Sequence, residues 1–265
     1  MPRGTPDPAT LGPGVSVGTV FASLLQFLIA CLILAGAEAI YVLLGFGAGM
    51  VAVGLLALVV PELRDVVVIL LLVNLPAEAW VVASSWRRIS WRGVLLVMAG
   101  VAAGIPLGSW LLSAGDLGAL LNLLAVVMVV VGGVFLLMPD RLPRSVPAWT
   151  APPVGLVSGV LTGLFGTGGP PLIFYYQLRG ADKTAFRGTL MAIFLLMTLI
   201  RVPSYAVFGL ITAPRIWSSL ALVPASMLGA FLGNRIHLRI DEATFRRLVS
   251  AALVVIGLTL LARGV

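Results

Sequence analysis

The stretch GLFGTGGPPLIF, residues 163–174, lies inside a long apolar segment, yet its first nine residues hold four glycines and two prolines. Glycine and proline are the two poorest helix formers. In a nonpolar environment, a broken helix leaves backbone groups unpaired unless protein surrounds them or the break lines a cavity. The stretch therefore predicts a deliberate helix break, and the rest of the sequence shows what surrounds it.

The composition indicates a membrane protein. Of the 265 residues, 60% are hydrophobic and only 10% are charged, whereas soluble domains carry about 25% charged residues. Apolar runs near the roughly 20 residues that cross a bilayer recur along the chain, and they are continuous rather than alternating, which favours helices over a β-barrel. We expect an all-α polytopic membrane protein.

A polar linker, PDRLPRSVPAWT at residues 139–150, divides the apolar segments into two halves. The expected segments are residues 15–33, 34–60, 66–84, 93–113, 118–138, 152–178, 188–210, 215–236 and 245–262.

Twelve of the 17 basic residues fall in four of the connections, and such loops stay on the cytoplasmic face. Segment 152–178 lies between two of these loops, so it is predicted to enter and leave from one face. Its length is too short for two crossings of about 20 residues each, so we expect a re-entrant hairpin with GTGGPP at its tip. The twelve residues are Arg87, Arg88, Arg92, Arg141, Arg144, Arg179, Lys183, Arg187, Arg235, Arg239, Arg246 and Arg247.

The two halves resemble each other in sequence. GFGAGM at residues 45–50 matches LFGTGG at 164–169, with Gly47 and Gly49 on Gly166 and Gly168, a spacing of 119 residues. GIPLG at 104–108 matches GAFLG at 229–233, and for this pair close helix packing is favoured over a binding role.

This resemblance predicts two repeats, each with one broken hairpin and three crossings. Three is an odd number, so the second repeat is expected to be inverted, as in many transporters whose site lies at the repeat interface. The expected divisions are 1–33 for an N-terminal segment with an extra helix, 34–138 for the first repeat, 139–151 for the linker and 152–265 for the second repeat.

The two predicted breaks are candidate anion sites. Glycine N–H groups and the positive end of a half-helix dipole bind anions without a charged side chain, and Pro170 suits a first helical turn, where no N–H is needed. The candidate substrate-binding residues at the breaks are Gly45, Gly47, Gly49, Gly166, Thr167, Gly168, Gly169 and Pro170.

Ionisable groups within apolar segments are the second signal. Arg201 is expected either to contact an anion, to pair with Glu78 or to snorkel to the bilayer surface. Glu38 and Glu78 could carry a proton or balance an arginine, and the sequence does not decide between these roles.

Four further residues complete the candidate substrate site: Arg187, Thr189, Asn74 and Gln177. Arg187 lies in FRGTL at the predicted cytoplasmic mouth, where a topology role is favoured. Asn74 and Gln177 are as suited to interhelical hydrogen bonds as to a ligand.

Other function classes lack their residues. No catalytic set, metal-ligand spacing or nucleotide-binding motif is present, so no catalytic residue, metal or cofactor is expected. The basic residues are scattered over short loops, which argues against nucleic acid as a partner.

The motifs GTGGPP and FRGTL, within GVLTGLFGTGGPPLIFYYQLRGADKTAFRGTL, resemble the second-repeat signature of the sulfite exporter (TauE/SafE-like) membrane transporters. The resemblance extends over nearly the whole chain after residue 34. It implies transport of small anions, typically sulfite, sulfonates or other organosulfur acids, often outward, across a prokaryotic plasma or inner membrane. The first repeat reads GFGAGM where that family more often has a glycine triplet, which moves the expected site to the second repeat.

The leading hypothesis is a secondary transporter, an exporter of small organosulfur anions, embedded in the lipid bilayer. An anion or small-solute channel is the alternative, because broken helices also line pores. A membrane-embedded enzyme is a distant third, since catalytic groups are absent. The sequence leaves the anion, the direction, proton or ion coupling and the oligomeric state open.

Overall fold

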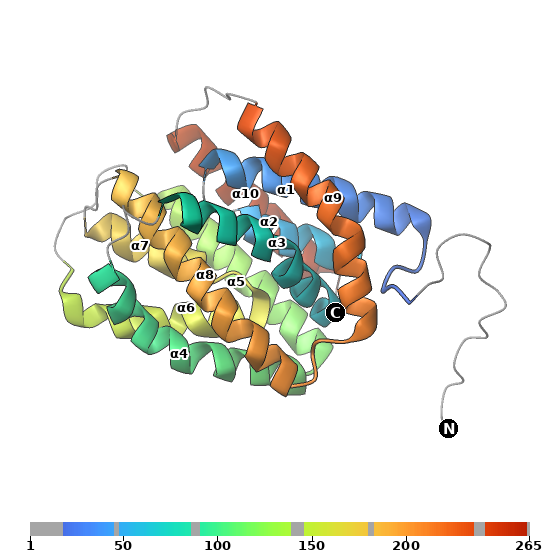
Figure 1. The fold of residues 1–265 in the computed structure, drawn as a ribbon, viewed down its shortest axis with the longest axis horizontal. Helices are drawn as coiled ribbons and strands as arrows, with labels where there is room; N and C mark the ends of the chain where they lie inside the picture. The colour runs from blue at the N-terminus through green and yellow to red at the C-terminus, as the bar shows by residue number, and fades with distance from the viewer. Residues whose placement is uncertain are drawn as a thin grey trace.

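The computed structural model describes residues 18–44, 48–85, 91–138, 146–179, 183–235 and 242–263, with only the backbone described in some helical stretches such as 77–85 and 183–188. Every regular element in these ranges is helical (Figure 1). The elements are α1 (Leu24–Leu44), α2 (Ala48–Ala57), α3 (Leu63–Ser85), α4 (Trp91–Ala114), α5 (Leu117–Leu137), a 3-10 turn (Ala148–Thr150), α6 (Ala151–Phe165), α7 (Gly169–Leu178), α8 (Lys183–Val207), α9 (Ala213–Arg235) and α10 (Glu242–Ala262).

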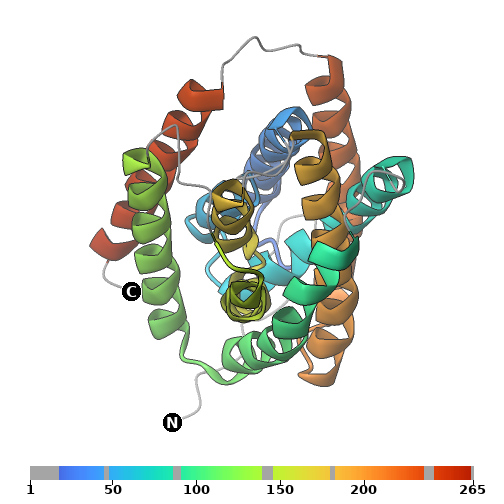
Figure 2. The same cartoon turned by 90° about the vertical axis from the view of Figure 1, so that its left-hand side faces the viewer.

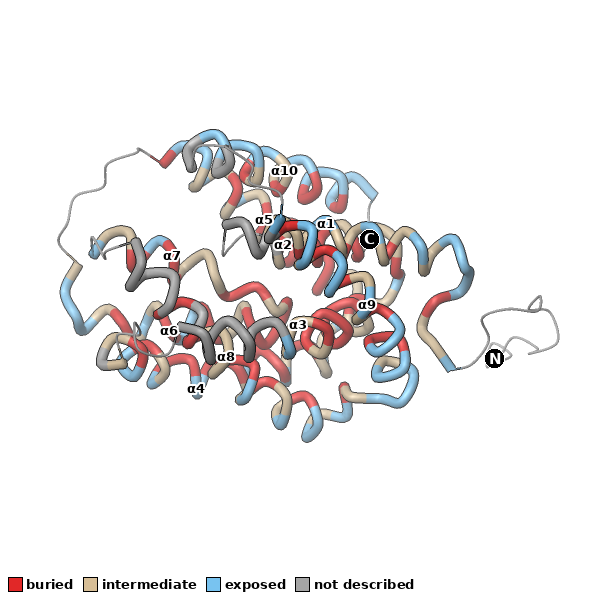
Figure 3. Tube along the Cα trace, turned by 45° about the horizontal axis from the view of Figure 1, so that its top comes forward, coloured by how far each residue is buried: buried red, intermediate tan, exposed pale blue. Residues whose placement is uncertain are grey.

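The helices suit a bilayer in both length and surface. Within the described ranges, four stretches are long and apolar enough to cross a membrane: Gly93–Ala114, Leu117–Leu137, Ala148–Phe165 and Ala213–Gly233. Large hydrophobic side chains are exposed on α4, α5, α9 and α10, among them Leu95, Leu123, Leu220 and Leu258. Figure 3 shows the exposed positions of the chain in pale blue. Such a surface is favourable against lipid and not against water. The expected all-α polytopic architecture is confirmed.

The predicted break is present at GTGGPP. Helix α6 ends at Phe165, and Gly166 follows with φ 73°, in the left-handed region that favours glycine. Its N–H donates to the Thr162 carbonyl at 2.8 Å. Helix α7 then begins at Gly169, so Pro170 and Pro171 fall in its first turn, where an N–H has no intrahelical acceptor.

The helix termini beside the four basic loops gather at one end of the bundle, which we call the basic end (Figure 1, left and upper left). Helices α3, α5, α7 and α9 end there, and α4, α6, α8 and α10 begin there. Helix α6 thus starts at the basic end and α7 returns to it. The other end, called the far end, holds the start of α3 and the end of α4, as their contact through Arg64 also shows.

Two parallel helix pairs pack through glycines. An added Cβ on Gly104 of α4 would lie 2.4 Å from the Leu156 carbonyl oxygen of α6, and one on Gly229 of α9 would lie 2.2 Å from the Ala35 carbonyl oxygen of α1. Such contacts, repeated at Gly108 and Gly233, leave no room for side chains. The packing interpretation of GIPLG and GAFLG is therefore confirmed.

The same contacts correct the predicted register of the two halves. Gly104 and Gly108 contact Leu156 and Val160 of α6. Gly229 and Gly233 contact Ala35 and Ala39 of α1. The two α1 residues precede the two α6 residues by 121 positions. The ends of α1 and α6 and the starts of α2 and α7 are also 121 apart. This spacing differs by two from the 119 predicted from the glycines, because repeated glycines can be aligned two residues out of step.

The first apolar segment is also divided differently from the prediction. Helix α1 is continuous from Leu24 to Leu44, so no helix boundary occurs at residues 33 and 34. Residues 24–44 contain no proline that would interrupt the helix. A Cβ added at Gly36 would meet no atom within 4 Å. The separate helix expected at 15–33 is not present among the described residues, which begin at Gly18.

The helices form three layers, and the break lies in the middle one (Figure 2). Helices α5 and α10 form an antiparallel pair on one side, in which Gly132 contacts Ser250 and Gly257 contacts Ala125. Helices α3, α4, α8 and α9 lie on the other side, and the interrupted pairs α1–α2 and α6–α7 lie between. The interrupted helices are thereby shielded from lipid on two sides.

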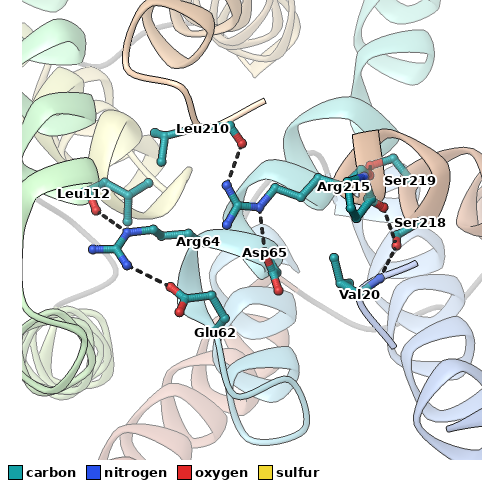
Figure 4. Close-up of polar contacts among 10 residues, drawn as sticks. Val20, Glu62, Arg64, Asp65, Leu112, Leu210, Arg215, Ser218 and Ser219 are labelled. Atoms are coloured by element: carbon teal, nitrogen blue, oxygen red, sulfur yellow. Dashed lines mark hydrogen bonds and ion pairs between the residues drawn. The ribbon is translucent and has the colours of Figure 1, made fainter. Parts of the chain in front are cut away.

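The basic residues of the far end are held by helix termini (Figure 4). Arg64 donates to the Leu112 and Gly115 carbonyls at 2.9 and 2.7 Å and pairs with Glu62 at 3.2 Å. Arg215 pairs with Asp65 at 2.7 Å and donates to the Leu210 carbonyl at 2.6 Å. A cation at a helix C-terminus is stabilised by the carbonyls and the dipole there. These contacts explain why two basic residues lie at the far end.

We expect Gly104→Ala to lower the free energy of unfolding by roughly 1–3 kcal/mol, because its methyl group would overlap the α6 backbone. Gly133→Ala is the matched control, since a Cβ at that helical glycine meets no atom within 4 Å. Thermal unfolding of the purified protein in detergent measures both. Equal midpoints for the two variants would contradict close packing of α4 on α6.

Candidate functional site

A cavity of ≈ 120 Å³ lies at the break between α6 and α7. Residues of α1, α2, α3, α5, α6, α7, α8 and α10 line it, whereas the glycine-packed helices α4 and α9 do not. In α8 the lining residues run from Phe194 to Arg201, and in α10 they run from Val249 to Leu253. Both stretches lie near the middle of their helices. Phe135, two residues before the end of α5 at the basic end, also lines the cavity, as does Ile173 of α7, so the cavity extends from the break toward the basic end.

Arg201 is the cation of this cavity. Its side chain is 5% exposed, and Nη2 donates to the Val67 carbonyl at 2.9 Å. The guanidinium stacks 4.8 Å from the centre of the Tyr205 ring, and Nε has no hydrogen-bond partner. No carboxylate within the described part of the chain forms an ion pair with it. A buried charge of this kind is costly unless an anion accompanies it.

The guanidinium lies directly against the break. A Cβ on Gly166 would be 2.7 Å from Arg201 Nη2. Glycine is therefore required at this position for two reasons, the left-handed backbone and the space occupied by the arginine. Because Arg201 is buried between α3 and the break, snorkelling to the surface is not its role. The side chain of Glu78 lies outside the described residues, so the proposed pair with Glu78 stays untested.

Two polar side chains add hydrogen-bonding groups to the cavity. Thr167, in the break itself, is 5% exposed, and its Oγ1 has no partner within hydrogen-bond distance. Asn74 of α3 also lines the cavity, with Oδ1 unpartnered. Buried polar atoms are nearly always satisfied, so these two atoms point to a ligand or to water.

Side chains of α6 hold the break in place. Ser158 donates to the Gly168 carbonyl, and Thr162 donates to the Ser158 carbonyl at 2.8 Å. A Cβ on Gly168 would lie 2.0 Å from Thr162 Oγ1. A side chain at Gly168 would point at α6. This glycine therefore allows the turn to pack closely against α6, in addition to any role in letting a ligand approach the backbone.

Not every candidate residue joins the cavity. Thr189 is buried and Gln177 is half-buried, but neither lines it. Gly45 and Gly47 lie outside the described residues, and for Arg187 only the backbone is described, within α8. Those that do line it are Glu38, Gly49, Asn74, Gly166, Thr167, Gly168, Gly169, Pro170 and Arg201.

Several cavity residues were not anticipated from the sequence. Thr162 and Thr198 are buried at 5% exposure, four residues before Gly166 and three before Arg201. That helical spacing places each on the same face as the residue it precedes, which is the signal that could have identified them. Phe194 and Met197 form part of the apolar wall, and nothing in their sequence context separates them from ordinary core residues.

Comparison with known proteins adds a family. The model of the family described as Sulfite exporter TauE/SafE matches residues 28–260. The chain belongs to this family. It is therefore a member of a transporter family and not an enzyme, and its apolar helices make it a multi-pass protein of the cell membrane.

Two relatives are similar over most of their length. A probable sulfite/organosulfonate exporter TauE of Cupriavidus necator is 28% identical over 221 residues, which cover 82% of this chain and 86% of the relative. A probable inner membrane transporter protein TsaS of Comamonas testosteroni is 27% identical over 193 residues, which cover 72% of this chain and 81% of the relative. No solved structure matches the chain.

Gly166→Ala is expected to weaken anion binding, because the new methyl group would displace Arg201. Gly209→Ala is the matched control: Gly209 also has a positive φ, 68°, but an added Cβ there meets no atom within 4 Å. Both changes should cost about 1–2 kcal/mol of stability from backbone strain. Titration with methanesulfonate then separates them, and equal affinity in the two variants would remove Arg201 from the effect of Gly166.

Proposed function

We propose that the protein is a secondary transporter, working as an exporter, for small organosulfur anions such as sulfite and sulfonates. The observation that carries this proposal is Arg201, a buried cation without an ion-pair partner among the described residues, at a helix break that lines a cavity. The name of the Cupriavidus necator relative and the family description support an organosulfur substrate, and the name of the Comamonas testosteroni relative supports transport. In this proposal the anion binds between Arg201 and the start of α7.

The start of α7 contributes to the proposed site without a side-chain charge. A helix N-terminus carries about half a positive charge, and Gly169 and Pro170 of the first turn line the cavity. Pro170 and Pro171 supply no N–H groups, so the remaining donors are the guanidinium, the Thr167 hydroxyl and the glycine amides of the break. These groups can surround an oxyanion of sulfite size on one side.

The proposed architecture is a pair of inverted repeats, residues 24–137 and 151–262, each with a re-entrant broken pair and three further helices. The matched packing of α4 on α6 and of α9 on α1, both parallel and both through glycines, supports this. So does the equal length of α2 and α7, each 10 residues. Gly49 and Met50 of α2 line the same cavity as the break in α6–α7, which fits a site at the repeat interface.

The packing beyond Arg201 favours a transporter over a channel. On the far-end side, Tyr205, Phe165 and Leu63 are fully buried in a continuous apolar core. A cavity with a packed floor suits alternating access, in which the site opens to one face at a time. In this proposal, Glu38, which lines the cavity at 4% exposure, is the first candidate for proton coupling, and Glu78 is the second.

Arg201→Gln should weaken sulfonate binding by about 30- to 150-fold, a loss of roughly 2–3 kcal/mol, because it removes the charge and keeps hydrogen bonding. Arg263→Gln, which changes an exposed arginine that donates to the Leu58 carbonyl, is the control. Binding to purified protein and uptake into vesicles measure both. Full transport by well-folded Arg201→Gln would remove this residue from the site.

The double variant Arg201→Gln with Glu78→Gln tests the competing ion pair. If Arg201 only balances Glu78, neutralising both should restore folding yield and transport. If Arg201 contacts the substrate, the double variant should bind no better than Arg201→Gln.

Single cysteines at Ala148 and Ala181, introduced into a Cys31→Ser background, should both be labelled from the cytoplasmic side. The expectation follows from the basic loops and from the return of α7 to the end where α6 begins. Membrane-impermeant maleimide applied to intact cells and to inverted vesicles provides the measurement. Labelling from opposite faces would turn 152–178 into a simple crossing and end the inverted-repeat proposal.

A further inference from the structure

Tyr205 of α8 lies beside the cavity without lining it. Its side chain is fully buried, and it belongs to the same apolar core as Phe165, the last residue of α6. The lining residues of α8 end at Arg201, four positions earlier. Residues four apart are neighbours on one face of a helix. Tyr205 therefore packs behind Arg201, on the side away from the cavity.

The Tyr205 hydroxyl fixes the end of α6. It donates to the Gly163 carbonyl at 2.8 Å. This carbonyl lies in the last turn of α6, where carbonyls lack an intrahelical donor. Gly163 is also fixed by α4, since a Cβ there would be 2.4 Å from the Ile105 carbonyl oxygen. Tyr205 thus supplies a hydrogen-bond donor that the break requires, and its ring is set at a fixed place relative to α6.

The Tyr205 ring holds the Arg201 guanidinium. Cζ of Arg201 lies over the ring, 4.8 Å from its centre. The electron-rich face of an aromatic ring attracts a cation, and more strongly where both groups are removed from water. The ring is neutral. It therefore holds the guanidinium in place and leaves the positive charge available to an anion, whereas a carboxylate in the same place would cancel that charge.

Three elements surround the guanidinium. Nη2 donates to the Val67 carbonyl of α3. On the side of the break, Gly166 leaves the space that the guanidinium occupies, since a Cβ there would be 2.7 Å from Nη2. Tyr205 is the contact that also bonds the end of α6. The position of the charge and the position of the break are therefore linked through this one side chain.

We propose that Tyr205 is a positioning residue for anion binding: its hydroxyl fixes the end of α6, and its ring holds the Arg201 guanidinium against the break. The inference rests on the proposed anion site at Arg201. It adds a residue outside the cavity that controls affinity through Arg201 and does not touch the anion.

The two roles of Tyr205 can be separated by substitution. Tyr205→Phe removes the hydroxyl and should lower the thermal unfolding midpoint by about 2–4 °C, because the Gly163 carbonyl loses its donor. Tyr205→Leu also removes the ring and should bind methanesulfonate about 5- to 30-fold more weakly than Tyr205→Phe. Isothermal titration of the purified protein in detergent gives the affinities.

Ring fluorination tests the contact with little change in the shape of the side chain. Phenylalanines with one, two or three ring fluorines, introduced at position 205 by nonsense suppression, progressively weaken the attraction for the cation. The affinity for methanesulfonate should fall about twofold per fluorine. The same residues at Phe208, which packs on the same core and does not line the cavity, are the control and should leave the affinity unchanged.

The same series in the Arg201→Gln background shows whether the ring acts through the guanidinium. Fluorination at position 205 should then have no effect on affinity, because no charge is left for the ring to hold. A purely structural role of the ring would give the same change in both backgrounds.

The outcomes separate this inference from the site on which it rests. If Arg201→Gln weakens binding, but fluorination has no effect or acts equally in both backgrounds, the positioning role is wrong and the anion site stands. If Tyr205→Leu does not fold, the fluorinated series alone decides. If methanesulfonate does not bind, or if Arg201→Gln binds it as wild type does, the proposed site itself is wrong.

Discussion

A helix that is interrupted within an apolar bundle needs hydrogen-bond partners for the backbone groups that the break leaves unpaired. At residues 166–168 very few groups supply them. Gly166 turns the chain in the left-handed region, and Ser158 holds the Gly168 carbonyl from the preceding helix. The same glycine leaves the space that the Arg201 guanidinium fills. The turn and the buried charge therefore depend on one another: a side chain at Gly166 would disturb both, and the cavity would lose its cation together with its shape.

Glycine packing gives this break a rigid support. Helix α4 holds α6 from outside through backbone contacts at Gly104 and Gly108, and α9 holds α1 through Gly229 and Gly233. Neither α4 nor α9 contributes to the cavity. The tightest contacts thus lie on the outer side of the interrupted pairs, where helices can approach closely because they have no side chains between them. The inner faces of α1 and α6 are left to line the site.

The helix break and the buried charge could be predicted from the sequence, because they depend on local residue types. The packing of helices that are distant in sequence could not. Glycine and proline at GTGGPP act through φ and missing N–H groups, so the break was predicted at the residues where it occurs, and Arg201 stood out as a charge in an apolar helix. The register of the two halves depends on which carbonyl each glycine meets, and the glycine pattern alone gave it two residues out of step. Thr162 and Thr198 look like ordinary helical threonines until the fold brings them to the cavity, while Thr189, from a motif that looked equally specific, lies elsewhere.

The position of the cavity relative to the basic loops links the site to a direction of transport. The cavity extends from Arg201 toward the end of the bundle where the helices that flank the four basic loops begin and end. If that end is cytoplasmic, as the distribution of arginine indicates, the same charges that orient the chain also raise the local concentration of cytoplasmic anions at the mouth. The membrane potential, negative inside, then favours outward movement of each negative charge by about 2.3 kcal/mol per 100 mV. In the proposed transporter, the membrane potential therefore drives anion export without any coupled ion.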